Sequence, residues 1–166
     1  MGRPTHDQRQ GPQEAFATFR PRRGRVVSGA FAVASVVLFA LIALLLPGLD
    51  AGGQWRVGDR LFFAGVGLSI GALLWRYATI RAVPTREGLT IRNLLTTRTI
   101  TWQAVVDLRF SGGDPWVTLE LDDTDTIAVM AVQKADGPFG RAEASRLAAL
   151  IQALGPSAPS PDVTGA

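Results

Sequence analysis

Two long apolar runs stand in the first half of the chain, and each predicts a membrane-spanning helix. The first, residues 26–46, contains 21 residues without a charge, and about 20 apolar residues in a helix cross the hydrocarbon core of a bilayer. The second, residues 61–75, is shorter, but Arg60 and Arg76 extend it because their aliphatic stems lie along apolar surface while their charges reach water. The expected elements are transmembrane helices at 26–47 and 61–78, joined by a short outer loop at 48–60.

After the second run, the period of the apolar residues changes to two. Leu89 and Ile91 alternate with Thr90 and Arg92, for example, and such alternation is typical of strands with one buried face. Short stretches rich in Gly, Asp and Pro separate the runs, and these residues favour turns. The pattern predicts six consecutive antiparallel strands, at 79–84, 88–93, 97–102, 105–111, 115–121 and 125–132.

Residues 141–154 return to a helical period. Five apolar residues share one face of this helix, which must bury them against the preceding sheet: Ala144, Leu147, Ala148, Ile151 and Leu154. The polar segments 1–25 and 156–166 are expected to be disordered tails, the first of them basic and cytoplasmic. We therefore expect an α+β membrane protein, in which a two-helix transmembrane hairpin precedes a small antiparallel β-barrel or sandwich, over 79–155, capped by a C-terminal amphipathic helix.

The net charge of +3 is concentrated beside the first apolar run. Residues 1–25 carry six arginines against two acidic residues, whereas residues 81–155 carry eight basic side chains against nine acidic ones. Basic residues beside a membrane-spanning helix keep that flank in the cytoplasm, so we expect a multi-pass plasma-membrane protein with both termini cytoplasmic. A cleaved signal peptide is disfavoured because the first run is long and a second follows it. Nucleic acid is not an expected partner, because the C-terminal part lacks a basic surface.

Small residues recur at a spacing of four in both apolar runs. Gly67 and Gly71 follow Ala64 in the second run, and Ala30 and Ala34 have the same spacing in the first. Such residues allow helices to approach closely. Packing of the two helices against each other in a hairpin is the favoured interpretation, because they are joined by a short turn; a homodimer is the alternative.

The residue types argue against catalysis and metal binding. The chain has no cysteine, and its only histidine, His6, lies in the polar N-terminal segment, so no serine has a histidine base. Asp122, Asp123 and Asp125 lack the further ligands and the glycine of a calcium loop, so a solvated turn is favoured over a cation site. We expect a non-enzymatic protein without a cofactor or a metal.

The charge of the predicted strands is uneven. Residues 81–109 carry five arginines against two acidic residues, while residues 110–136 carry six acidic residues against one lysine. The first strands follow the membrane directly, and a basic residue near an anionic membrane surface contributes about 1 kcal/mol. Contacts to lipid headgroups are therefore predicted for Arg81, Arg86, Arg92 and Arg98; the alternative is that these side chains are simply solvated.

Several local stretches resemble one family. RAVPTREGLTIRN (81–93), RTITW (98–102), VVDLRF (105–110) with the later Trp116, and AVQKADG (131–137) are similar to the actinobacterial family named after low molecular weight protein antigen six, whose members are pleckstrin-homology-like (PH-like) membrane proteins. The resemblance implies a PH-like barrel tethered to the plasma membrane, with no catalytic residues. The chain departs from this pattern in two respects: six strands are predicted where a PH barrel has seven, and the phosphoinositide-binding basic loop of eukaryotic PH domains is not evident.

Two functions are compatible with these observations. The favoured one is a non-enzymatic, membrane-anchored PH-like module that docks a protein partner at the inner face of the plasma membrane through a sheet edge or a helix groove. The alternative is a module that senses anionic lipid through its arginine-rich first strands. The hairpin alone supplies stable attachment, so targeting does not require lipid affinity in the module.

Overall fold

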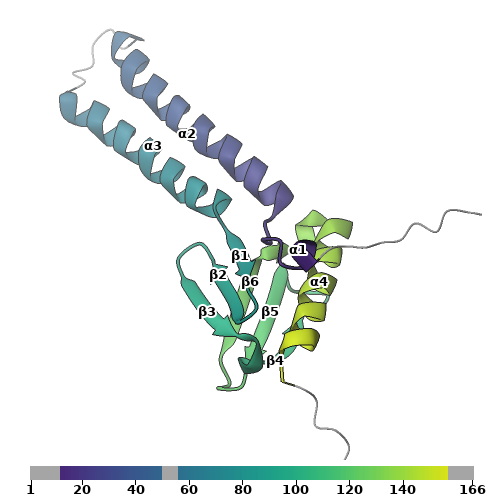
Figure 1. Cartoon of the computed structure of the whole chain (residues 1–166). Helices are drawn as coiled ribbons and strands as arrows, with labels where there is room; N and C mark the ends of the chain where they lie inside the picture. The colour runs from purple at the N-terminus through teal and green to yellow at the C-terminus, as the bar shows by residue number, and fades with distance from the viewer. Residues whose placement is uncertain (1–11, 50–55, 157–166) are drawn as a thin grey trace, which may run out of the picture.

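The computed structural model describes residues 12–49 and 56–156. In Figure 1, two long helices extend as a hairpin from one end of a domain that is built of two small sheets and a helix. The predicted C-terminal tail beyond residue 156, the first 11 residues and the loop segment 50–55 lie outside the described residues.

The hairpin consists of α2 (Arg22–Leu49) and α3 (Val57–Ala78). Both helices are long and apolar enough to cross a membrane, and less than a fifth of each apolar stretch is buried. Each helix begins four residues earlier than the apolar run predicted. The helix α2 begins earlier because residues 22–25, three of which are arginine, are themselves helical, and arginine is a good helix former.

Glycines of α3 contact α2 directly. A Cβ atom added at Gly67 would lie 2.5 Å from Cβ of Phe39, and one added at Gly71 would lie 2.6 Å from Cγ2 of Val36. The predicted close approach of the two helices at these glycines is therefore present within the hairpin. Ala30 and Ala34, by contrast, are exposed, so their predicted packing against α3 is wrong. Ala32, which is buried, lies on the contacting side of α2 instead, and Ala64 of α3 is half-buried.

The domain contains the six predicted strands, each within two residues of its expected bounds. They form two three-stranded antiparallel sheets, ordered β1-β2-β3 and β4-β5-β6. The short 3₁₀ segment η1 (Trp102–Ala104) links the sheets, and η2 (Lys134–Asp136) follows the last strand. The strands are β1 (Arg81–Pro84), β2 (Gly88–Arg92), β3 (Thr97–Thr101), β4 (Val105–Arg109), β5 (Trp116–Leu121) and β6 (Thr126–Gln133).

The core lies between the two sheets and α4 (Pro138–Leu154). Helix α4 begins three residues earlier than predicted because Pro138 occupies its first position, where a missing N–H has no consequence. The indole of Trp102 is fully buried, and its Nε1 donates a hydrogen bond to the carbonyl of Thr85 at 2.9 Å. The strands alternate as expected, with Leu89, Ile91, Val117, Leu119, Ile127 and Val129 all buried.

The segment before the hairpin is also part of the domain. Phe19 is fully buried in the core and forms an antiparallel bridge with Ala82 of β1, with N–O distances of 2.8 and 3.0 Å. A short helix, α1 (Pro12–Ala15), precedes it. The expectation of disorder throughout 1–25 is thus wrong for residues 12–25. Phe19 joins β1 by a single bridge, and one residue leaves no periodic pattern in the sequence.

Candidate functional site

The two helices of the hairpin are attached to the end of β6 and to η2, which follows it. The carboxylate of Asp136, which is buried, accepts hydrogen bonds from the backbone N–H groups of Arg22 at 3.0 Å and Arg23 at 2.9 Å. It thereby satisfies free donors at the start of α2 and places a negative charge at the positive end of the helix dipole. The side chain of Gln133 donates to the hydroxyl of Tyr77 in α3 at 3.2 Å. The domain and the hairpin are therefore joined by buried polar contacts.

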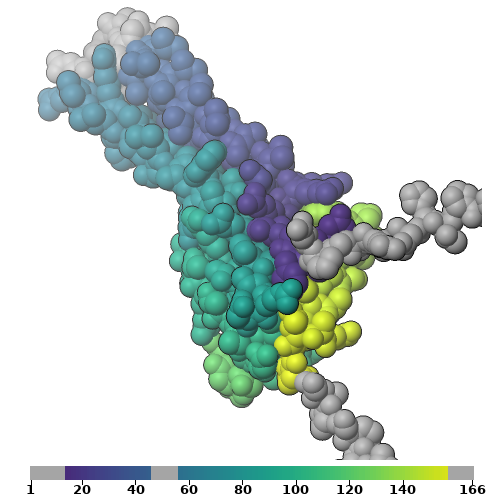
Figure 2. Space-filling model, in the orientation of Figure 1, coloured from purple at the N-terminus to yellow at the C-terminus, as the bar shows by residue number. Residues whose placement is uncertain are grey.

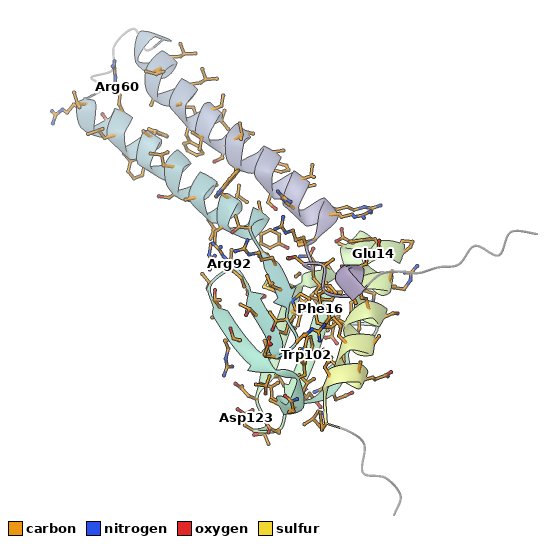
Figure 3. All side chains as sticks on the ribbon, in the orientation of Figure 1. Glu14, Phe16, Arg60, Arg92, Trp102 and Asp123 are labelled. Carbon is orange, nitrogen blue, oxygen red and sulfur yellow. The ribbon has the colours of Figure 1, made fainter. Side chains whose placement is uncertain are left out.

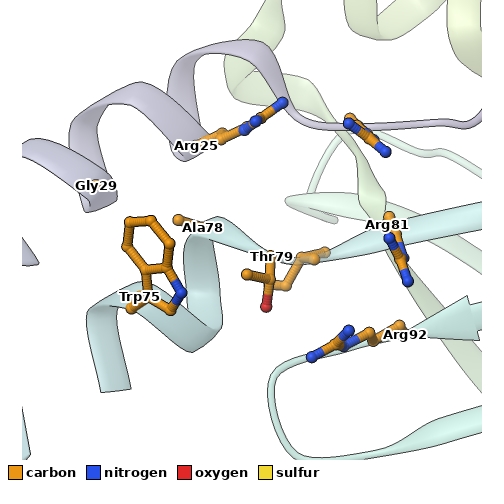
Figure 4. Close-up of a pocket in the computed structure, with 9 residues that line it drawn as sticks. Arg25, Gly29, Trp75, Ala78, Thr79, Arg81 and Arg92 are labelled. Atoms are coloured by element: carbon orange, nitrogen blue, oxygen red, sulfur yellow. The ribbon is translucent and has the colours of Figure 1, made fainter. Parts of the chain in front are cut away.

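An open groove of about 340 Å³ lies at this junction (Figure 4). Its walls come from the start of α2, the end of α3, and strands β1 and β2. Figure 4 shows Arg81 and Arg92 side by side, with Arg25 opposite them and the indole of Trp75 at one end. The lining residues include four arginines: Arg20, Arg25, Arg81 and Arg92.

A second groove of about 370 Å³ adjoins the first over the outer face of β1 and β2. It shares Arg81 and Arg92 with the first groove and adds Arg76 from the last turn of α3. Among the described residues, no carboxylate lines either groove, and none of these arginines forms an ion pair. We call this set the arginine groove; it consists of Arg20, Arg25, Arg76, Arg81 and Arg92.

Two of these arginines are direct neighbours across the sheet. Arg81 of β1 and Arg92 of β2 are register partners in the antiparallel ladder. Like charges at directly opposite positions destabilise a sheet. Clustered guanidinium groups without a carboxylate also create a strong positive potential, which attracts anions. The arrangement is therefore unfavourable by itself and becomes favourable when an anion lies between the two side chains.

The structure separates the four arginines that were predicted to contact lipid. Arg81 and Arg92 belong to the arginine groove, whereas Arg86 lies in the turn between β1 and β2, at the opposite end of these strands. Arg98 is engaged in an ion pair with Asp125, at 2.6 Å. Alternation along the strands could not reveal this division, because Arg86 is separated by the antiparallel register and Arg98 by a tertiary ion pair.

Sequence reasoning did not assign Arg20, Arg25 and Arg76 to a site. The first two were interpreted only as the basic flank that orients the first helix, and Arg76 only as a residue that lengthens the second. Their proximity to the apolar runs was the available signal. The arginines before the first helix and those at the start of the first strands can share one surface, because the chain passes directly from the second helix into the sheet.

The aspartates near the β5–β6 turn serve the turn itself. The side chain of Asp123 accepts a hydrogen bond from the backbone N–H of Asp125 at 3.0 Å. The pKa of Asp125 lies below its ordinary value, mainly because Arg98 donates a hydrogen bond to its carboxylate, with further contributions from the N–H of Thr126 and the charge of Arg98. Over the described part of the chain, no group of three or more His, Cys, Asp or Glu residues is placed to hold a metal ion.

The chain's own N-terminal segment covers the edge of β1 and contacts α4. The guanidinium of Arg146 in α4 lies 3.7 Å from the ring centroid of Phe19 and donates hydrogen bonds to the carbonyls of Ala15 and Ala17, both at 2.8 Å. It also pairs with Glu143 at 2.7 Å. An exposed sheet edge can bind an extended peptide as an added strand. Here that surface is occupied within the same chain.

The comparisons with known proteins agree with this architecture. The bacterial PH domain family matches residues 80–149. The uncharacterized proteins Rv1417 of Mycobacterium tuberculosis and Mb1452 of Mycobacterium bovis are each 32% identical to this chain over 109 residues, which cover 64% of this chain and 71% of each relative. This chain belongs to the bacterial PH domain family. No solved structure matches it.

Membership confirms the predicted resemblance to bacterial PH-like proteins and supports a binding module. PH-like domains are generally non-catalytic and bind proteins or lipids. The relatives are themselves uncharacterized, so the ligand of this chain has to be inferred from its own surface.

Proposed function

We propose that this protein is a membrane-anchored PH-like module that binds anionic phospholipid headgroups in the arginine groove, at the inner face of the plasma membrane. The observation that carries the proposal is the pair of opposed arginines, Arg81 and Arg92, at the base of the hairpin and without an acidic partner among the described residues.

The surface of the hairpin supports membrane anchoring. Large apolar side chains are exposed along both helices. Soluble proteins rarely expose so large a contiguous apolar area to water. A bilayer covers such a surface, and a helix satisfies its own backbone groups there. Examples are Val26 (72% exposed), Phe31 (63%), Leu44 (68%), Leu61 (67%) and Leu68 (61%).

Charge supports the orientation of the hairpin. All five arginines of the groove gather at the end where the hairpin meets the domain, and basic residues remain on the cytoplasmic side of a membrane. Trp75, which is 61% exposed at the end of α3, is suited to the headgroup level. In this orientation the groove opens beside the inner leaflet, and both termini are cytoplasmic.

The chemistry of the groove suits phosphate. A guanidinium presents a planar set of donors that can bind phosphate oxygens in pairs, and it keeps its charge at any physiological pH. Each basic residue near an anionic surface contributes about 1 kcal/mol. The interaction weakens with salt because charges at the membrane surface are screened within about 10 Å.

Docking of a protein partner is the alternative function. The surface formed by β1 and α4 is already occupied by residues 12–19, which leaves the other sheet edges, such as β3 and β4. No contact or charge pattern among the described residues favours a particular protein there. Lipid binding is therefore the function that the geometry supports better.

The test uses the full chain, because Phe19 and Arg20 lie outside any fragment that begins at residue 79. The purified protein in neutral detergent micelles is titrated calorimetrically with dioctanoyl-phosphatidylglycerol. Dioctanoyl-phosphatidylcholine serves as the neutral lipid, and glycerol phosphate as a soluble phosphate ester. The test variant is Arg81→Gln/Arg92→Gln, and the matched control is Arg86→Gln/Arg98→Gln, which removes the same charge elsewhere.

We expect saturable binding of the anionic lipid only. Loss of two headgroup contacts worth about 1 kcal/mol each weakens binding about thirty-fold in the test variant, while the control variant binds as the wild type does. Equal losses of affinity in both variants would mean that binding depends on the net charge of the protein and not on the arginine groove. Binding of glycerol phosphate with similar affinity would assign the groove to a soluble ligand, and no binding in any titration would favour the protein partner.

A further inference from the structure

Leu95 is the most exposed large hydrophobic residue among those described, with 83% of its surface accessible. It lies in the turn between β2 and β3, residues 93–96. The preceding residue, Leu94, packs against the core instead. The turn therefore packs one leucine, partly buried, against the core and exposes the other.

The turn is held firmly. The amide of Asn93 donates a hydrogen bond to the carbonyl of Ala128 at 2.7 Å, and its oxygen accepts one from the backbone of Met130 at 3.3 Å. The backbone N–H of Asn93 also donates to the carbonyl of Thr96 at 2.8 Å, which closes the turn. The exposure of Leu95 thus results from a defined conformation rather than from a loose loop.

Both ends of the turn lie beside the last helical turn of α3. Arg92, just before the turn, lines the first groove together with Trp75. Thr97, just after it, lines the second groove together with Arg76. Figure 1 shows the β2–β3 turn next to the lower end of α3, and Figure 3 labels Arg92 in the same place.

We propose that the β2–β3 turn enters the inner leaflet and that Leu95 inserts at the boundary between headgroups and acyl chains. The proposal rests on the membrane anchoring proposed above. If Trp75 lies at headgroup level, the neighbouring start of the turn lies there as well, and the four-residue turn extends from that level. An apolar side chain beside arginines is the combination by which peripheral segments bind anionic interfaces.

A single exposed leucine on a protein surface is ordinary, because much of any protein surface is apolar. Val106 of β4 is such a case: it is 66% exposed, and it adjoins Val105, which pairs with Leu121 beside the turn at 122–125. That turn is at the opposite end of the sheet from the hairpin. Val106 is therefore a matched control for Leu95, being apolar and exposed but away from the proposed membrane surface.

The experiment exploits the absence of cysteine from the chain. The single-cysteine variants Leu95→Cys, Val106→Cys and Leu68→Cys are labelled with the polarity-sensitive fluorophore NBD. Leu68 is an exposed residue in the middle of α3 and reports on the hairpin. The full-length proteins are reconstituted into vesicles of phosphatidylcholine and phosphatidylglycerol, with and without lipids that carry a nitroxide quencher near the headgroup or deep in the acyl chain.

We expect a blue-shifted emission at position 95 and a several-fold stronger quenching by the shallow nitroxide than at position 106. Position 68 responds to the deep nitroxide. If position 68 is quenched while position 95 emits as position 106 does, the insertion of Leu95 is refuted and the anchoring stands. If position 68 is not quenched, the anchoring itself fails. Equal thermal unfolding of the unlabelled variants confirms that the substitutions preserve the fold.

Discussion

The arginine groove and the rest of the domain differ in how their arginines are compensated. At the hairpin end, five arginines lie around one groove without an acidic partner among the described residues. Outside this set, Arg98 pairs with Asp125, Arg109 with Glu120, and Arg146 with Glu143. In Figure 3, Arg92 lies near the hairpin, and Asp123 lies at the opposite end of the domain. Among the described residues, the three arginines that form an ion pair all lie outside the arginine groove, and the five of the groove form none.

The ends also differ in how they are held together. The far end consists of tight turns whose aspartates bond to their own backbone, as Asp123 does. The hairpin end instead joins segments that are distant in the sequence, through Phe19, Asp136 and Gln133. In the space-filling view of Figure 2, the segment before the hairpin lies against the C-terminal helix. Substitutions at the hairpin end should therefore have the larger effects.

The largest effect is expected for Phe19→Ala. Removal of a fully buried phenylalanine leaves a cavity and lowers the free energy of unfolding by about 3–5 kcal/mol. Thermal unfolding of the full chain in micelles, followed by the fluorescence of its tryptophans, measures the change. Phe16→Ala is the control, because Phe16 is only partly buried against the core. An unchanged unfolding temperature for Phe19→Ala would exclude the N-terminal segment from the domain.

A smaller loss is expected for Asp136→Ala. The substitution deprives two N–H groups at the start of α2 of their acceptor, and loss of a helix cap lowers stability by about 1–2 kcal/mol. Asp114→Ala should change little, since Asp114 accepts only from the hydroxyl of Ser111 and from no helix. Denaturant titration of both variants in the same micelles makes the comparison. Equal losses would mean that the carboxylate does not connect domain and hairpin.

Opposite signs are expected for an arginine of the groove and an arginine outside it. In neutral micelles, Arg92→Gln should raise the unfolding free energy by about 0.2–1 kcal/mol, because it removes the like charge opposite Arg81. Arg98→Gln should lower it slightly, because it breaks the ion pair with Asp125. Thermal unfolding of the full chain in micelles, as for Phe19→Ala, measures both changes in stability. A loss of stability in Arg92→Gln would show that Arg92 has a structural partner and would weaken the proposed groove.

The smallest effect concerns the pH dependence of the ion pair between Arg98 and Asp125. Because Arg98 lowers the pKa of Asp125 in the folded protein, the ion pair stabilises the fold above the ordinary carboxyl pKa. That contribution is lost as the pH falls through the lowered folded value. The unfolding temperature of the wild type should therefore decrease more steeply on acidification than that of Asp125→Asn. Parallel curves for the two proteins would show that the exposed pair contributes nothing.

The candidate site was only partly predictable. Arg81 and Arg92 were expected to contact lipid because they follow the second apolar run in the sequence. Arg86 and Arg98 were grouped with them for the same reason, because alternation places residues on a face but identifies neither the end of a strand nor a tertiary ion pair. The turn between β1 and β2 places Arg86 at one end of the sheet. Strand β2 then runs back, so that Arg92 lies at the other end. The antiparallel register thus separates Arg86, and the ion pair with Asp125 separates Arg98.

The sequence by itself determined the six strands, the C-terminal helix and the two long apolar helices, because each has a local period or run that its own residues express. Tertiary structure decided where the domain begins, which face of α2 meets α3, and which arginines share a groove. Phe19 joins β1 by one bridge, and Asp136 is the acceptor for a helix far earlier in the chain. Contacts of this kind depend on single residues that meet only after folding, so no periodic pattern in the sequence predicts them.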